Sequence, residues 1–82
     1  MIDIEAALAP LNLPSHIHIK AARLTLTIAM AHNLYDVLQA ATRAEGFGLG
    51  LETVKALNPA SQEGLYLAFD AASQARQAEL PS

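Results

Sequence analysis

Three histidines are the residues whose type and spacing could support metal chemistry. His16 and His18 stand two residues apart, and His32 follows fourteen residues after His18. On a β-strand the first two imidazoles would point to the same side and could bind one metal ion. On a helix they would diverge by about 200°, and His18 and His32 would lie about 21 Å apart along one stripe. We therefore predict no metal site, with metal or small-ligand binding through these three histidines as the alternative.

Three glycines at alternate positions suggest a second kind of site. Gly46, Gly48 and Gly50 form the segment GFGLG, and the backbone N–H groups of glycine-rich loops can bind phosphate. The spacing is neither G-x-G-x-x-G nor a Walker A motif, because no Lys-Ser or Lys-Thr pair follows. We interpret residues 46–50 as the end of a helix followed by a flexible loop, without a phosphate site.

Nucleophilic catalysis has little support in this sequence. Serines, histidines and aspartates could be combined into a triad on paper, but no motif marks a nucleophile. The closest pair of carboxylates, Asp3 and Glu5, is better explained by the positive end of a short N-terminal helix. We therefore predict no catalytic residue, no cofactor and no enzymatic activity.

Composition excludes several classes of protein. The 82 residues include 5 Lys and Arg against 8 Asp and Glu, a net charge of -3, which argues against binding to nucleic acid through phosphate contacts. The absence of cysteine removes disulfide scaffolds, thiolate zinc sites and iron–sulfur clusters. A hydrophobic content of 52% with only 16% charged residues is unlike a disordered chain. One folded domain spanning residues 1–82 is expected.

The distribution of charge also bears on location. The N-terminal residues Met1–Glu5 carry acidic side chains and lack the basic region of a signal peptide. An apolar stretch without Asp, Glu, Lys or Arg runs from Leu24 to Tyr35, well short of the ~20 residues that a membrane-spanning helix needs. We expect a soluble, cytoplasmic protein without a membrane segment.

Prolines divide the N-terminal region from the rest. Residues 2–9 are compatible with a short helix, and Pro10 and Pro14 then interrupt helical structure. Leu11 and Leu13 lie between the two prolines and are expected to anchor an extended connection.

The central region predicts one long helix from about His16 to Glu45, with Ser15 as its N-cap and Gly46 at its C-terminal end. One set of apolar residues follows a heptad pattern: Ile17, Ala21, Leu24, Ile28, Ala31, Tyr35 and Leu38. A second set lies on a neighbouring flank: Leu26, Met30, Leu34, Val37 and Ala41. A helix that is apolar on two flanks must be covered on both.

A β-hairpin over residues 16–30 is the alternative for part of this region. Apolar residues there also alternate with a period of two, and Thr25 and Thr27 favour strands. The turn would fall at residues 20–23, which are good helix formers and contain no Gly, Asn or Asp. We therefore favour the helix.

The C-terminal region predicts two further helices. Leu51, Val54 and Leu57 repeat every three residues and indicate a short helix over 51–57. Asn58 and Pro59 then provide the N-cap and first residue of a helix that ends near Leu80. Its inner face follows one of two registers: Leu65, Phe69, Ala72 and Arg76, or Leu65, Ala68, Ala72 and Ala75.

Together these elements predict an all-α fold, a small bundle of three to four helices that assembles as a homodimer through the long helix. We expect a non-catalytic protein–protein interaction module, such as a small adaptor, a chaperone-like protein or a regulatory subunit. Its partner would be a second copy or another protein, and its interface would use Ile17, Leu24, Ile28, Tyr35 and Leu38.

Overall fold

The computed structural model describes residues 3–81, in which the regular secondary structure is entirely helical. The helices are α1 (Ile4–Leu8), the 3-10 helix η1 (Ala9–Leu11), α2 (Ser15–Ala29), α3 (Leu34–Thr53) and α4 (Pro59–Glu79). This confirms the predicted all-α bundle and shows that the β-hairpin alternative is wrong. Within the same residues, no helix is both long and apolar enough to cross a membrane.

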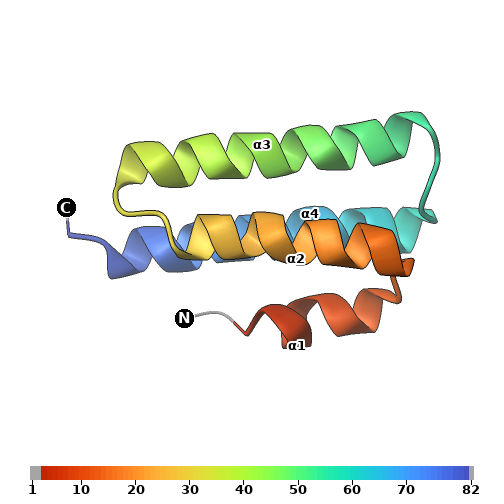
Figure 1. Cartoon of the computed structure of the whole chain (residues 1–82), viewed down its shortest axis with the longest axis horizontal. Helices are drawn as coiled ribbons and strands as arrows, with labels where there is room; N and C mark the ends of the chain where they lie inside the picture. The colour runs from red at the N-terminus through yellow and green to blue at the C-terminus, as the bar shows by residue number, and fades with distance from the viewer. Residues whose placement is uncertain (1–2, 82) are drawn as a thin grey trace.

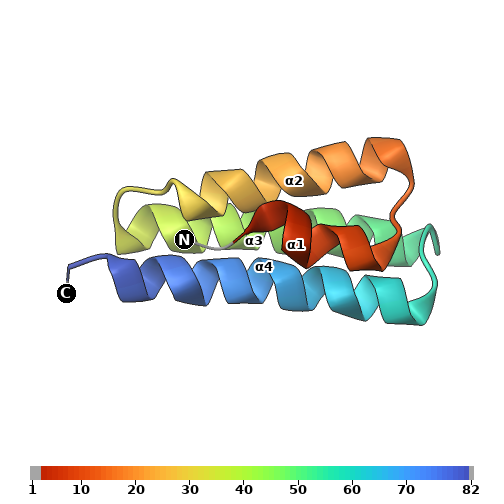
Figure 2. The same cartoon turned by 90° about the horizontal axis from the view of Figure 1, so that it is seen from below.

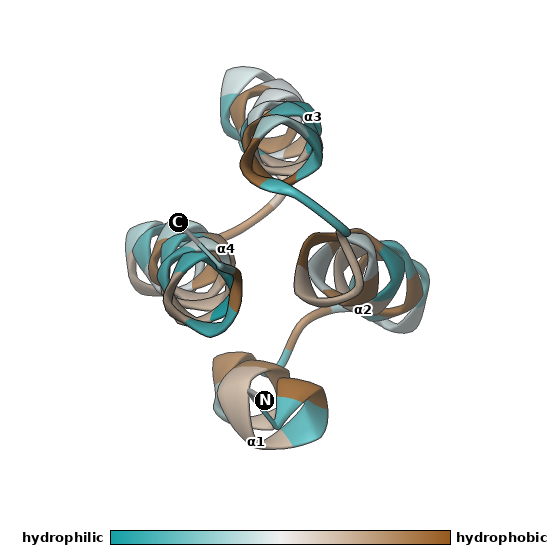
Figure 3. Cartoon of the chain, turned by 90° about the vertical axis from the view of Figure 1, so that its left-hand side faces the viewer, coloured by the Kyte–Doolittle hydropathy of each residue, from teal (hydrophilic) through white to brown (hydrophobic). Residues whose placement is uncertain are grey.

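The three long helices pack side by side, each running opposite to the one before it in the chain (Figure 1). The short helix α1 lies against α2 and α4, on the side of the bundle away from α3 (Figures 2 and 3). The inner face of α3 is therefore covered by α2 and α4, while no element of the described chain covers its outer face.

The predicted helix over residues 16–45 is wrong as a single element, because the chain reverses between Ala29 and Leu34. The Asn33 side chain accepts a hydrogen bond from the Asp36 backbone N–H at 2.8 Å and so caps a new helix. Because the chain reverses, the apolar face of α2 packs against the apolar face of α3. In a single continuous helix these two segments could not contact each other.

Helical structure in α2 also accommodates its two threonines. The Thr25 hydroxyl donates to the Ala21 carbonyl at 2.8 Å, and the Thr27 hydroxyl donates to the Arg23 carbonyl at 3.0 Å. These bonds satisfy each hydroxyl inside the helix, so strand preference does not decide the structure. The Ser15 N-cap is a wrong prediction, because Ser15 is the first helical residue and Pro14 occupies the cap without a side-chain hydrogen bond.

The predicted loop over residues 46–50 and helix over 51–57 are also wrong, because α3 continues through the three glycines to Thr53. Lys55 then adopts the left-handed conformation, with φ of 54°. The Ala56 N–H donates to the Leu51 carbonyl and the Lys55 N–H donates to the Glu52 carbonyl. This is a Schellman ending formed without glycine at its left-handed position.

The signals at the start of α4 are confirmed. Asn58 caps the helix by accepting from the Ser61 N–H at 2.8 Å, and Pro59 is its first residue. The inner face includes residues of both predicted registers: Leu65, Ala68, Phe69 and Ala72 are buried. Arg76 is only partly buried, and its Nε donates to the Ala31 carbonyl at 2.8 Å, which ties α4 to the end of α2.

The N-terminal helix is shorter than predicted and is extended by η1. Asp3 caps α1 through the Ala6 N–H at 3.1 Å, while residue 2 lies outside the described residues. Pro10 lies within η1, so the expected extended connection is shorter than residues 10–14. Leu11 and Leu13 are partly buried against the core, as anchors should be.

The core of the bundle brings every helix together. Its fully buried large side chains are Leu8 of α1, Thr25 and Ile28 of α2, Val37 of α3 and Leu65 of α4. Burial of such side chains is the main favourable contribution to folding.

We expect Ile28→Asp to lower the free energy of unfolding by a large part of its total. Leaving an unpaired charge in the core costs about 3–5 kcal/mol, against a total stability of about 5–15 kcal/mol for a small domain. Leu26→Asp, two residues away on the half-exposed side of α2, should change stability little. Urea denaturation followed by circular dichroism measures both, and equal stability of the two variants would contradict this core.

Candidate functional site

The structure divides the predicted interface residues at the reversal between α2 and α3. Ile17, Leu24 and Ile28 are buried within the chain, where they pack in the core. Tyr35 and Leu38 lie beyond the turn and are exposed on α3, by 69% and 49% respectively. The heptad pattern continues in sequence across the turn. Its part in α2 faces the interior of the bundle, and its part in α3 at Tyr35 and Leu38 faces the solvent.

The second apolar set is divided in a similar way. Leu26, Met30 and Leu34 are about half exposed near the reversal, whereas Val37 is fully buried and Ala41 is partly buried. Exposed apolar side chains from both ends of the turn therefore gather at one end of the bundle.

A continuous uncharged stripe runs along the solvent side of α3, and we call it the outer seam. It consists of Tyr35, Leu38, Thr42, Gly46, Leu49 and Thr53, all exposed. Their steps of three or four residues place them on one face of the helix, opposite the buried face of Val37, Ala40, Ala44 and Gly48. Leu49 is 50% exposed, so the seam presents large apolar side chains near both ends.

Each flank of the outer seam borders a groove. On the α2 side, Asp36 and Arg43 line a groove of about 490 Å³, together with Leu26 and Met30. Asp36 accepts a hydrogen bond from the Asn33 side-chain amide at 3.2 Å. The Arg43 side chain forms no hydrogen bond or ion pair within residues 3–81. This flank therefore carries one negative and one positive charge that do not compensate each other within the chain.

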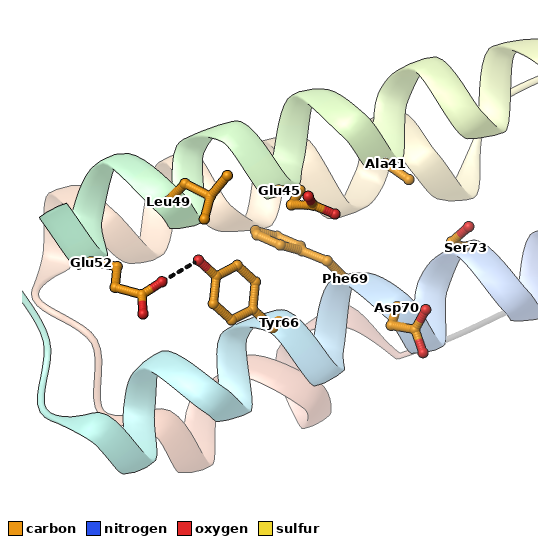
Figure 4. A pocket seen from close by; sticks show the side chains of 8 residues that line it. All are labelled: Ala41, Glu45, Leu49, Glu52, Tyr66, Phe69, Asp70 and Ser73. Atoms are coloured by element: carbon orange, nitrogen blue, oxygen red, sulfur yellow. Dashed lines mark hydrogen bonds between the residues drawn. The ribbon is translucent and has the colours of Figure 1, made fainter.

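The groove on the α4 side has a volume of about 390 Å³ and an acidic character (Figure 4). Its lining comes from Ala41, Glu45, Leu49 and Glu52 of α3 and from Tyr66, Phe69, Asp70 and Ser73 of α4. All three of its charged residues are carboxylates. The lining contains no histidine or cysteine.

Tyr66 closes one end of this groove by packing directly on the backbone of α3. A Cβ atom at Gly48 would lie 2.6 Å from a carbon of the Tyr66 ring, so only glycine permits this approach. Gln62 strengthens the same contact, because its side-chain amide donates to the Gly48 carbonyl at 2.8 Å. Glycine at this position thus serves close helix packing, which the sequence pattern alone did not reveal.

The Tyr66 phenol also joins the two helices electrostatically. Its hydroxyl donates to Glu52 Oε1 at 2.9 Å (Figure 4). The pKa of Tyr66 is raised from its ordinary value of 10.0, first by desolvation and then by the hydrogen bond to Glu52 and the negative charge of that carboxylate. The protonated phenol is therefore the form that this contact stabilises.

The three histidines are not brought together. His16 and His18 lie in the first turn of α2, and His18 contacts Glu5 Oε1 at 3.3 Å. His32 lies in the turn after the other end of the same helix. Among residues 3–81 there is no group of three or more His, Asp or Glu side chains arranged to hold a metal ion.

Comparisons with known proteins add no relative: no family model matches the chain, and no curated protein or solved structure is significantly similar to it.

Two glycine substitutions should have opposite effects on stability. Gly48→Ala should destabilise the fold by about 1–3 kcal/mol, because the new methyl group overpacks the Tyr66 ring. Gly46→Ala should stabilise it by about 0.5–1 kcal/mol, because no atom lies within 4 Å of the new methyl group and alanine favours helix. Urea denaturation measures both free energies, and effects of the same sign would contradict the packing described for Gly48.

The Tyr66–Glu52 contact predicts a pH dependence. Because the pKa of Tyr66 is raised in the fold, its contribution to stability is fully present below about pH 10 and is lost as pH rises through the folded-state pKa. Glu52→Gln removes the negative charge and should shift the titration of Tyr66 to lower pH. Carbon-13 NMR of the labelled tyrosine ring follows this directly, and an unchanged titration would show that Glu52 has no influence.

Proposed function

We propose that this chain is a non-catalytic protein–protein interaction module, an adaptor, chaperone-like or regulatory protein that binds its partner through the outer seam of α3. The observation that carries the proposal is the seam itself. It places Tyr35, Leu38 and Leu49 in solvent on a helix whose opposite face is already packed in the core.

The energetics of these side chains favour a bound state. Complete burial of one leucine contributes about 1.5–3 kcal/mol relative to exposure, and both seam leucines are about half exposed. Tyrosine is enriched among the residues that dominate binding energy, because its ring buries a large area and its hydroxyl retains polar contacts. The hydroxyl of Tyr35 already accepts a hydrogen bond from Gln39, which orients the ring before binding.

The geometry of the seam suits recognition by another helix. Tyr35 and Leu49 are separated by fourteen residues of helix, or about 21 Å, with Leu38, Thr42 and Gly46 between them. Anchors at intervals of three and four residues are the pattern by which helices pack in grooves and against each other. Because the seam lies on a packed helix, its backbone is already ordered before binding, which lowers the entropic cost of association.

A photo-crosslinking amino acid tests this proposal in living cells of the organism that makes the protein. Placed at Tyr35, it should give a discrete crosslinked product, and adding Leu38→Asp should reduce that product at least about tenfold, because the charge opposes burial of the seam. The matched control carries the same amino acid at Leu67, which is 61% exposed on α4 outside the seam.

Mass spectrometry of the crosslinked product identifies the captured protein. Products from Tyr35 that disappear with Leu38→Asp, and that Leu67 does not give, are the expected result. No product from Tyr35, or the same products from both positions, would overturn the assignment of function to the outer seam.

A further inference from the structure

We infer that the partner of the outer seam is a second copy of this chain, packed with its α3 antiparallel to the first across a twofold axis. The inference rests on the proposed function and identifies the protein that binds the outer seam. In this arrangement Asp36 lies beside Arg43 of the second copy, and Tyr35 lies opposite Gly46 of the second copy.

Charge on the α2-side flank supports a symmetric, antiparallel pair. Asp36 and Arg43 are seven residues apart, so they lie on the same side of α3, and both line the α2-side groove. A twofold axis perpendicular to α3, passing near residue 40, sets the same flanks of the two copies against each other and reverses their direction. Each Asp36 then meets an Arg43 of the other copy, and the pair forms twice by symmetry.

The same axis also brings the two acidic flanks to the same side of the contact, but it offsets their carboxylates along the helix. Glu45 of one copy falls level with residues 34–36 of the other, about 15 Å along the helix from the second Glu45. Glu45, which lines the α4-side groove, therefore does not meet the Glu45 of the second copy. This matters for a chain with a net charge of -3, because two copies must associate against their overall repulsion.

Side-chain sizes along the seam also favour the antiparallel direction. Its N-terminal end carries Tyr35 and Leu38, whereas Gly46 and Gly50 near the other end have no atom within 4 Å of a Cβ position. A helix-interior glycine is less stable than alanine, and no internal contact explains these two as Tyr66 explains Gly48. Leu49 lies between these two glycines, so the open space is at Gly46 itself, and reversing one copy sets Tyr35 of one seam on Gly46 of the other.

The surface area available around the seam is sufficient for a small dimer interface. The 20 residues of α3 are about 30 Å long, and two neighbouring helices form a face about 20 Å wide. The resulting area of about 600 Å² per copy corresponds to the lower limit of stable interfaces. Leu26 and Met30 extend the apolar contact, because they border the groove that holds Asp36 and Arg43.

A charge-exchange experiment tests both the partner and its direction. Asp36→Arg alone and Arg43→Asp alone should each raise the dimer dissociation constant at least about tenfold, because each variant sets like charges together twice. Mixing the two variants should restore association as a heterodimer, since every pair across that interface is again of opposite charge. Sedimentation equilibrium gives the dissociation constants, and native mass spectrometry separates the heterodimer from both homodimers.

The outcomes separate this inference from the proposed function. Recovery of the dimer on mixing cannot come from a folding defect in either variant, because each chain keeps its own substitution. A parallel dimer would set Arg43 near Glu45 of the second copy, so insensitivity to Asp36→Arg overturns the antiparallel arrangement. A wild-type monomer at all concentrations, with a different protein crosslinked to Tyr35, overturns self-association and leaves the interaction function standing. Lys55→Asp, outside the seam, is the control and should not change the dissociation constant.

Discussion

The reversal of the chain between α2 and α3 is the constraint on which the rest of the fold depends. Two of the hydrogen bonds at this turn connect it to the helices: the Asp36 N–H donates to the Asn33 side chain, and Arg76 donates to the Ala31 carbonyl. The first begins a helix, and the second places a cation at the C-terminal end of another, where it interacts favourably with the helix dipole. Because Arg76 belongs to α4, the same turn fixes all three long helices relative to one another.

The reversal also explains which parts of the fold could be predicted from the sequence. The Asn58-Pro59 pair acts over three or four residues, so local patterns were sufficient to place the start of α4, whereas the first helix was predicted over residues 2–9 and begins at Ile4, after the Asp3 cap. The break at residues 30–33 was missed because apolar residues keep the heptad spacing on both sides of it. The signal that could have located it was Asn33 three residues before Asp36, a polar cap followed by an acidic residue in the first helical turn.

The candidate site shows the same division between local and distant causes. Tyr35 and Leu38 were identified from their spacing, but whether they face solvent depends on the direction of α3 after the turn. The GFGLG segment was interpreted as a helix end followed by a flexible loop, because glycine at Gly46 suits the residue that follows a helix. The structure explains Gly48 through Tyr66, which is eighteen residues further along the chain. A contact at that distance leaves no periodic pattern in the sequence.

Tyr66 and Gly48 also define how this sequence can change during evolution. The ring occupies the space of any side chain at position 48, and Gln62 bonds to the carbonyl of the same glycine. A larger residue at 48 therefore requires a smaller one at 66, and each single step passes through a clash or a cavity. Substitutions at positions 48 and 66 are therefore expected to occur together in homologues of this chain, with a larger side chain at one position and a smaller one at the other.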